Sequence, residues 1–109
     1  MECKVDVGLT GKHIKGDRKT ELTIKYTDMP EKMKETVISL GHRALGRFQT
    51  EIDIATYIKD YMDKTYRGGR WHAFVGRNIK VCCSYENGKF IHFFIGDLAF
   101  IIFRTEYTQ

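Results

Sequence analysis

The residues of this chain that could carry nucleophilic or metal chemistry are few: four histidines, three cysteines and two serines. No two histidines have the H-x-x-x-H or H-E-x-x-H spacing that places two imidazoles on one metal ion. Neither Ser39 nor Ser84 stands in a pattern that would set a serine on a nucleophile turn beside a base. His72 and His92 lie in strand-like runs, so we expect them to be packed and hydrogen-bonded rather than bound to metal.

Cysteines and carboxylates also lack a catalytic pattern. Cys82 and Cys83 are adjacent in a strand-like run, Cys3 lies in a polar segment, and no C-x-x-C spacing occurs, so we expect free thiols in a reducing compartment. Acidic residues such as Glu31 and Glu35 fall on expected helix starts and helix surfaces, where helix electrostatics explains them. The sequence therefore predicts a protein that is not an enzyme and has no cofactor and no metal site.

The charge balance raises nucleic-acid binding as an alternative function. Lys and Arg total 18 against 14 Asp and Glu, for a net charge of +4. Segment 70–77 overlays part of an RNA-recognition strand motif, but Trp71 and His72 replace its glycine and first aromatic residue. That fold also interleaves helices with strands, whereas both helices expected here precede the last strands. An RNA- or nucleic-acid-binding α+β module is kept as the alternative, because a solvated basic surface explains the charge equally well.

Length and composition fit one globular domain. The chain has 109 residues, of which 42% are apolar and 29% charged. Its longest apolar run, residues 98–103, is far shorter than the roughly 18 to 20 residues that cross a bilayer. The residues after Met1 lack the apolar region that a secretory signal requires. We therefore expect a cytoplasmic protein that does not associate with membranes.

Apolar periodicity predicts two helices after a first strand. Residues 21–26 alternate between apolar and polar side chains, as a half-buried strand does. Asp28 and Glu31 then form a candidate capping box around Pro30, and apolar residues follow at spacings of three and four as far as Phe48. A second helix begins at a Thr50–Asp53 capping pair and ends near residues 67–69.

Four strands are predicted after the helices, at residues 71–75, 81–85, 90–95 and 98–103, separated by turn sequences. The fold class is α+β, with one N-terminal strand, a two-helix hairpin and a four-stranded antiparallel meander, in the order β-α-α-β-β-β-β. Residues 1–19 show no sustained apolar period and hold five Lys or Arg against three acids. We expect them to form a flexible basic arm.

Both faces of the last two predicted strands are apolar. A sheet covered by helices on one side only should carry polar residues on its other side. Two helices cannot cover both faces, so we expect a second polypeptide, most simply a second copy of the chain, to cover the face around Phe93 and Ile101.

Three segments together have a specific resemblance. Segments 53–59 (DIATYIK), 71–78 (WHAFVGRN) and 90–96 (FIHFFIG) resemble the small dynein light chains of the eight-kilodalton, dimeric hub class. The resemblance covers residues 20–104, which would form the dynein light chain domain and leave residues 105–109 as a C-terminal tail. It implies a strand-swapped twofold dimer with two symmetric grooves, each between the strand at 80–85 and the second helix. A partner's extended segment, often with a Thr-Gln-Thr core, would add there as an extra strand.

The resemblance also implies which residues act. Glu51 and the N–H of Ile52 would receive a glutamine side chain of the partner. The remaining peptide-binding residues would be Lys80, Val81, Cys82, Cys83, Ser84 and Tyr85 on the paired edge, with Phe90, His92 and Phe94 lining pockets. The dimer interface would contain His72, Ile79, Val81, Cys83 and Tyr85. Burial of two imidazoles there would make the dimer sensitive to acid.

Five positions depart from the family pattern, and several of them lie in or beside the implied groove. Relatives usually carry Lys at Ile52, Gly at Lys80, Ser at Val81, Tyr at Cys82 and His at Tyr85. The implied partners are a dynein intermediate chain, a second light chain in a homodimer or heterodimer, and other clients with Thr-Gln-Thr-like segments. The implied location is the microtubule cytoskeleton of the cytoplasm, with a ciliary or flagellar axoneme as the alternative for a specialised paralogue.

Overall fold

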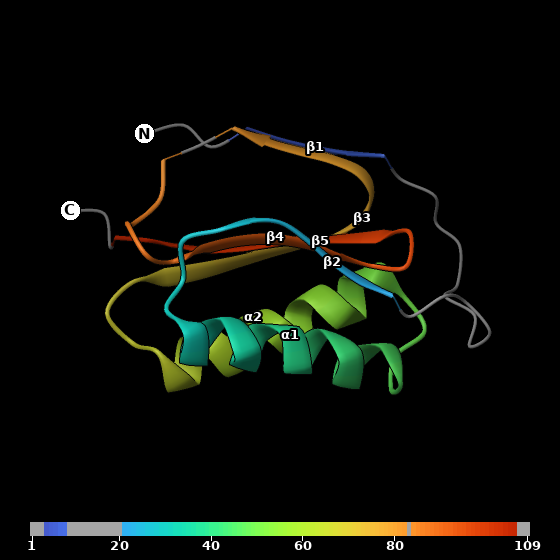
Figure 1. The fold of residues 1–109 in the computed structure, drawn as a ribbon, viewed down its shortest axis with the longest axis horizontal. Coiled ribbons are helices and arrows are strands. Elements are labelled where there is room, and N and C mark those ends of the chain that lie inside the picture. The colour runs from blue at the N-terminus through green and yellow to red at the C-terminus, as the bar shows by residue number, and fades with distance from the viewer. Residues whose placement is uncertain (1–3, 9–20, 83, 107–109) are drawn as a thin grey trace.

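The computed structural model describes residues 4–8, 21–82 and 84–106. The elements in chain order are β1 (Lys4–Gly8), β2 (Leu22–Thr27), α1 (Glu31–Leu45), α2 (Glu51–Thr65), β3 (Arg70–Cys82), β4 (Phe90–Ile95) and β5 (Leu98–Thr105). The strands form one antiparallel sheet in the order β1-β3-β5-β4-β2. Both helices lie side by side on one face of that sheet (Figure 1). The predicted α+β class and the order of strand, two helices and antiparallel strands are confirmed.

Three strands, rather than the predicted four, follow the helices. The strands predicted at 71–75 and 81–85 join in one long strand, β3, which ends at Cys82. Gly-Arg-Asn at 76–78 suggests a turn, but Gly76 still pairs with Ala99 on β5. Asn78 takes a left-handed φ of 58°, which asparagine tolerates better than most residues. The chain therefore bends within β3 without leaving it.

The strand β1 lies within the segment that the sequence predicted as an arm without elements. It pairs antiparallel with Arg77–Cys82, which we call the distal half of β3. Five residues are too few to show a period against the glycines around them. The paired residues are also 69 to 78 positions apart along the chain, so local patterns carry no sign of the pairing.

The two helices begin differently. The Thr50 hydroxyl accepts a hydrogen bond from the Asp53 N–H at 3.2 Å, as predicted for α2. The capping role predicted for Asp28 at α1 is wrong, because no side chain caps that helix. The Asp28 carboxylate instead accepts hydrogen bonds from the N–H groups of Gly88 and Phe90, both at 3.0 Å. Backbone donors of a distant turn thus outcompete the adjacent helix for this carboxylate.

The main core lies between the helices and the sheet. Periodic apolar residues of both helices, including Val37, Ile54 and Ile58, are fully buried against it. From the sheet, the rings of Phe93 and Phe100 stack with centroids 4.8 Å apart and planes 5° from parallel. The helical spacing in the sequence therefore identified this core correctly.

The second face of the sheet is covered within the chain. Ile79, on the distal half of β3, packs in one cluster with Ala99, Ile101 and Phe103 and leaves Ile101 only 2% exposed. Figure 1 shows this part of β3 curving over the sheet on the side away from the helices. The sequence argument that only a second polypeptide could cover this face is wrong. Phe93 faces the helices instead.

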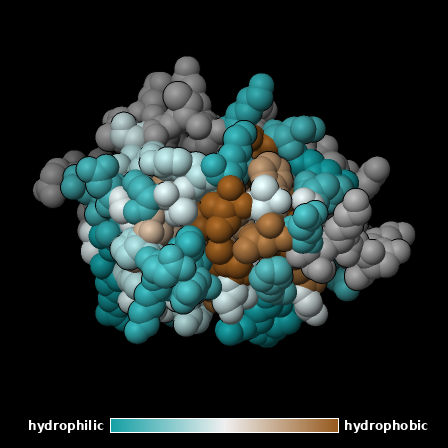
Figure 2. Space-filling model, viewed as in Figure 1, coloured by the Kyte–Doolittle hydropathy of each residue, from teal (hydrophilic) through white to brown (hydrophobic). Residues whose placement is uncertain are grey.

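The strand β2 forms the other outer edge of the sheet. Its Leu22 and Ile24 are 40% and 39% exposed. Figure 2, viewed from the same side as Figure 1, shows apolar surface gathered near the middle of this side of the molecule. A register shift between Ile24 and Tyr26 turns Tyr26 toward the second face, where its ring lies 5.8 Å from that of Phe90. This bulge links β2 to the aromatic residues described next.

Candidate functional site

Aromatic side chains line the second face of β4 at alternate positions. Phe90, His92 and Phe94 are all half-buried there, since successive residues of a strand point to opposite faces. Phe90 stacks on Tyr85 with ring centroids 4.5 Å apart, and His92 lies 5.3 Å from Phe94. The structure therefore brings together the residues that the sequence assigned to peptide pockets. We call Phe90, His92 and Phe94 the aromatic row.

The distal half of β3 carries part of the predicted binding edge. Lys80 is exposed and Ile79 is buried, while the backbone of Val81 and Cys82 belongs to the strand. Cys83 lies outside the described residues. Ser84 and Tyr85 follow the strand rather than extend it, so the strand predicted for 81–85 does not include these two residues. The chain then returns to β4, which begins at Phe90.

Two site residues lie in the first turn of α2. Ile52 is 76% exposed and Glu51 is half-buried. Burial raises the pKa of the Glu51 carboxyl, and the positive charge of Arg77 acts in the opposite direction. Arg77 is the first residue of the distal half of β3, so a charge on this strand acts on the carboxyl group of Glu51 in α2. The first N–H groups of a helix have no partner within it and can donate to a ligand.

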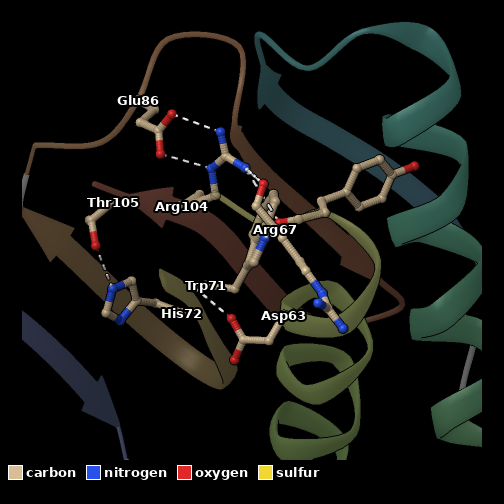
Figure 3. Close-up of polar contacts among 8 residues, drawn as sticks. Asp63, Arg67, Trp71, His72, Glu86, Arg104 and Thr105 are labelled. Atoms are coloured by element: carbon tan, nitrogen blue, oxygen red, sulfur yellow. Dashed lines mark hydrogen bonds and ion pairs between the residues drawn. The ribbon is translucent and has the colours of Figure 1, made fainter. Parts of the chain in front are cut away.

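His72 is half-buried on β3. Its Nε2 lies 3.0 Å from the Thr105 hydroxyl (Figure 3). Its ring stacks on Phe103 with centroids 5.1 Å apart. Burial lowers the pKa of the imidazole, the charges of Lys59 and Arg70 lower it further, and Asp63 opposes them. The expectation of a packed, hydrogen-bonded histidine is confirmed for His72. It is wrong for Nε2 of His92, which is buried without a hydrogen-bond partner among the described residues. The predicted role of His72 in a dimer interface stays a prediction.

An ion pair that the sequence did not reveal fixes the loop carrying Tyr85. Arg104 donates through Nε and Nη2 to the two carboxylate oxygens of Glu86, each at 2.8 Å, and through Nη1 to the Arg67 carbonyl at 2.9 Å (Figure 3). The Glu86 N–H in turn donates to the Arg104 carbonyl at 3.0 Å. Residues so far apart show no spacing pattern, so only the folded chain identifies the pair.

The described part of the chain contains no group of three or more His, Cys, Asp or Glu side chains placed to hold a metal ion. Among the same residues, no helix is both long and apolar enough to span a bilayer. The arrangement that remains is a strand edge, an aromatic row and the start of a helix. A strand edge and side chains at alternate positions can hold an extended peptide through main-chain hydrogen bonds and side-chain pockets. Within one chain the aromatic row and α2 lie on opposite faces of the sheet.

Comparison with known proteins identifies the family. Residues 21–105 match the family described as dynein light chain type 1. The chain belongs to the dynein light chain family. Cytoplasmic dynein light chain 1 of Debaryomyces hansenii is 37% identical over 82% of this chain and 97% of its own length. The Saccharomyces cerevisiae protein of the same name is also 37% identical, over 82% of this chain and 96% of its own.

A solved structure agrees on the fold of this dynein light chain. The dynein light chain-like domain of a calcium-binding protein from Fasciola hepatica matches with a TM-score of 0.64 at 21% identity, over 79% of this chain and 92% of that one. Cytoplasmic dynein light chain of Emericella nidulans is 36% identical over 81% of this chain and 93% of its own length. The family match begins at residue 21, so β1 lies outside it.

Proposed function

We propose that this dynein light chain is a non-catalytic dimerisation hub. It binds extended segments of dynein intermediate chains, and of other partners with Thr-Gln-Thr-like cores, by β-strand addition in two symmetric grooves. The observation that carries the proposal is the packing of Phe90 and Phe94, two members of the aromatic row, against the cluster that contains Ile79 of the distal half of β3. A strand edge supplies main-chain hydrogen bonds, and a row at alternate positions supplies pockets for alternate ligand side chains.

Two further features support this groove. Glu51 and Ile52 stand in the first turn of α2, where a helix offers free N–H donors to a glutamine carbonyl. The positive charge of Arg77 on β3 also lowers the pKa of the Glu51 carboxyl, against the effect of burial. The exposed Lys80, where relatives usually carry glycine, adds a positive charge to the edge and favours ligands with an acidic residue beside the core.

The packing of Ile79 supports a strand-swapped dimer. In one chain the distal half of β3 covers the sheet's second face through this side chain. The same strand can make the same contacts on the sheet of a second copy, which is the relation between a closed protomer and a swapped dimer. His72, Val81, Cys83 and Tyr85 would then share the interface with it. Two linked grooves would bind a paired ligand with avidity above that of a single site.

The names of the relatives support a location. They are cytoplasmic dynein light chains of fungi. We place the protein in the cytoplasm, on the microtubule cytoskeleton, as a subunit of a dynein complex.

A calorimetric titration tests this function. The protein is titrated with a peptide containing a Thr-Gln-Thr core at two salt concentrations, and with single-stranded RNA under the same conditions. Saturable peptide binding with weak salt dependence supports the hub. Binding of RNA that weakens steeply with salt, without peptide binding, would support the nucleic-acid alternative. Sedimentation at pH 7 and pH 5 tests the dimer, which we expect to dissociate on acidification as the His72 imidazoles gain charge.

A further inference from the structure

The strand β1 occupies a backbone edge of the distal half of β3. The register is antiparallel, with Lys4 opposite Cys82, Val5 opposite Val81 and Asp6 opposite Lys80. A register shift follows Asp6 and places Gly8 opposite Arg77. Figure 1 shows the two strands running together over the second face of the sheet. This half of β3 therefore already has a strand partner from its own chain.

This pairing takes groups that strand addition needs. The N–H and C=O of each strand residue point to one edge and form main-chain bonds with one neighbouring strand there. Residues 80–82 belong to the edge proposed to pair with a peptide, and residues 4–6 lie opposite them. A ligand strand on the same edge must displace β1 before it can form its own main-chain hydrogen bonds.

The far end of the pairing lies at Arg77, the first residue of the distal half of β3. Gly8 stands opposite Arg77, and the charge of Arg77 acts on Glu51 in the first turn of α2. β1 thus runs along the whole distal half, from Cys82 to Arg77.

Sequence and family comparison mark β1 as an addition to the shared domain. The family match spans residues 21–105, whereas β1 is Lys-Val-Asp-Val-Gly at 4–8. Valines at alternate positions favour an extended strand. Because β1 belongs to the same chain, it competes at a high effective concentration without needing high intrinsic affinity.

We propose that β1 is a built-in competitor of strand addition, which occupies the binding edge until a ligand with a more favourable segment displaces it. This inference rests on the proposed function, because it takes the distal half of β3 as the edge that binds. Its consequence is a raised threshold for ligands: weak segments are excluded, and removal of the β1 pairing should tighten peptide binding by at least about fivefold.

The test uses the full chain with two double variants. Successive residues of a strand direct their N–H groups to opposite edges, so either Val5 or Asp6 donates toward β3. Replacing both, Val5→Pro with Asp6→Pro, therefore removes that donor whichever residue supplies it. The matched control, Val5→Ala with Asp6→Ala, keeps both donors and removes only side chains. Each protein is titrated with the Thr-Gln-Thr peptide, and amide hydrogen exchange is measured across residues 77–82.

Competition predicts that the proline variant binds the peptide at least about fivefold more tightly than wild type and the alanine control. It also predicts faster exchange at 77–82 in the free proline variant alone. Equal peptide affinity in all three proteins overturns the inference and leaves the proposed function standing. If no protein binds the peptide, the proposed function fails. Amide hydrogen exchange at residues 77–82 tests separately whether β1 covers the edge. If the exchange rates of the proline variant equal those of wild type, the inference is overturned.

Discussion

Gly69 packs directly against the carbonyl oxygen of Thr105: a Cβ added to Gly69 would lie 2.5 Å from that oxygen. The same Cβ would lie 2.7 Å from Oε2 of Glu86 and 2.8 Å from Cγ of Arg104. The start of β3 and the end of β5 therefore meet at a point where only glycine fits. The side chains of the Arg104–Glu86 ion pair also border this contact.

Gly69→Ala is expected to destabilise the protein by about 1 to 3 kcal/mol, because backbone must move to relieve the overlap. Gly46→Ala is the matched control. Its added Cβ would come no closer than 3.6 Å to the Arg43 carbonyl, so its effect should stay within about 0.5 kcal/mol of zero or stabilise slightly. Urea unfolding monitored by Trp71 fluorescence measures both. Equal stabilities of the two variants would contradict the close approach.

Removing the Arg104–Glu86 ion pair should also lower stability. The two side chains are only 12% and 20% exposed, and a lysine at 104 cannot reproduce the paired hydrogen bonds. We expect Arg104→Lys to cost about 1 to 3 kcal/mol in the free energy of unfolding. Glu31→Gln is the control, since Glu31 is 69% exposed in its pair with Lys34 and should cost less than about 0.5 kcal/mol. A cost for Arg104→Lys no larger than that of the control would show that the pair contributes little.

The pH dependence of stability follows from His72. Burial holds its pKa below the ordinary value, so the unfolded chain binds the proton more tightly than the folded one. The contribution to stability is complete above the ordinary histidine pKa of about 6.5 and is lost as pH falls toward the folded pKa. His92 shifts in the same direction for the same main cause.

His72→Asn should therefore lose less stability than wild type between pH 7.5 and pH 5.5. The exposed His42 on α1 offers a control, and His42→Asn should lose as much as wild type. Chemical unfolding at several pH values gives the comparison. A pH profile of His72→Asn that overlays the wild-type profile would contradict the role of this imidazole.

Sequence patterns predicted the local parts of this fold and missed the distant ones. Helical spacing identified buried residues such as Val37 and Ile58, because helix faces repeat over neighbouring residues. The continuity of β3 through Asn78 was missed, since Gly-Arg-Asn is also a common turn sequence. Coverage of the second face by Ile79 depends on where a strand bends, which alternation alone cannot determine.

The candidate site was predicted in a similar way. The aromatic row follows from alternation along one strand, and the resemblance to dynein light chains singled out its members. The Glu86–Arg104 pair and the strand β1 depend on contacts between distant residues, for which the sequence has no spacing rule. The capping role of Asp28 was wrong because the turn at 88–90 offers two donors to the same carboxylate.

Glu51→Ala should weaken binding of the Thr-Gln-Thr peptide without affecting the fold. Loss of a carboxylate that accepts from the ligand's amide is expected to lower affinity by about tenfold. Glu35→Ala, at an exposed position of α1, is the control and should bind as wild type does. Calorimetry measures the affinities, and urea unfolding verifies that both variants are folded. Unchanged affinity for Glu51→Ala would remove this residue from the groove.

Mapping of the peptide site by NMR tests the central proposal most directly. Amide shifts are followed in the full chain during titration with the Thr-Gln-Thr peptide. The proposal predicts that the largest shifts cluster in the distal half of β3, at Glu51 and Ile52, and along the aromatic row. Saturable shifts confined to other surfaces, such as the exposed edge of β2, or no shifts at saturating peptide, would contradict it.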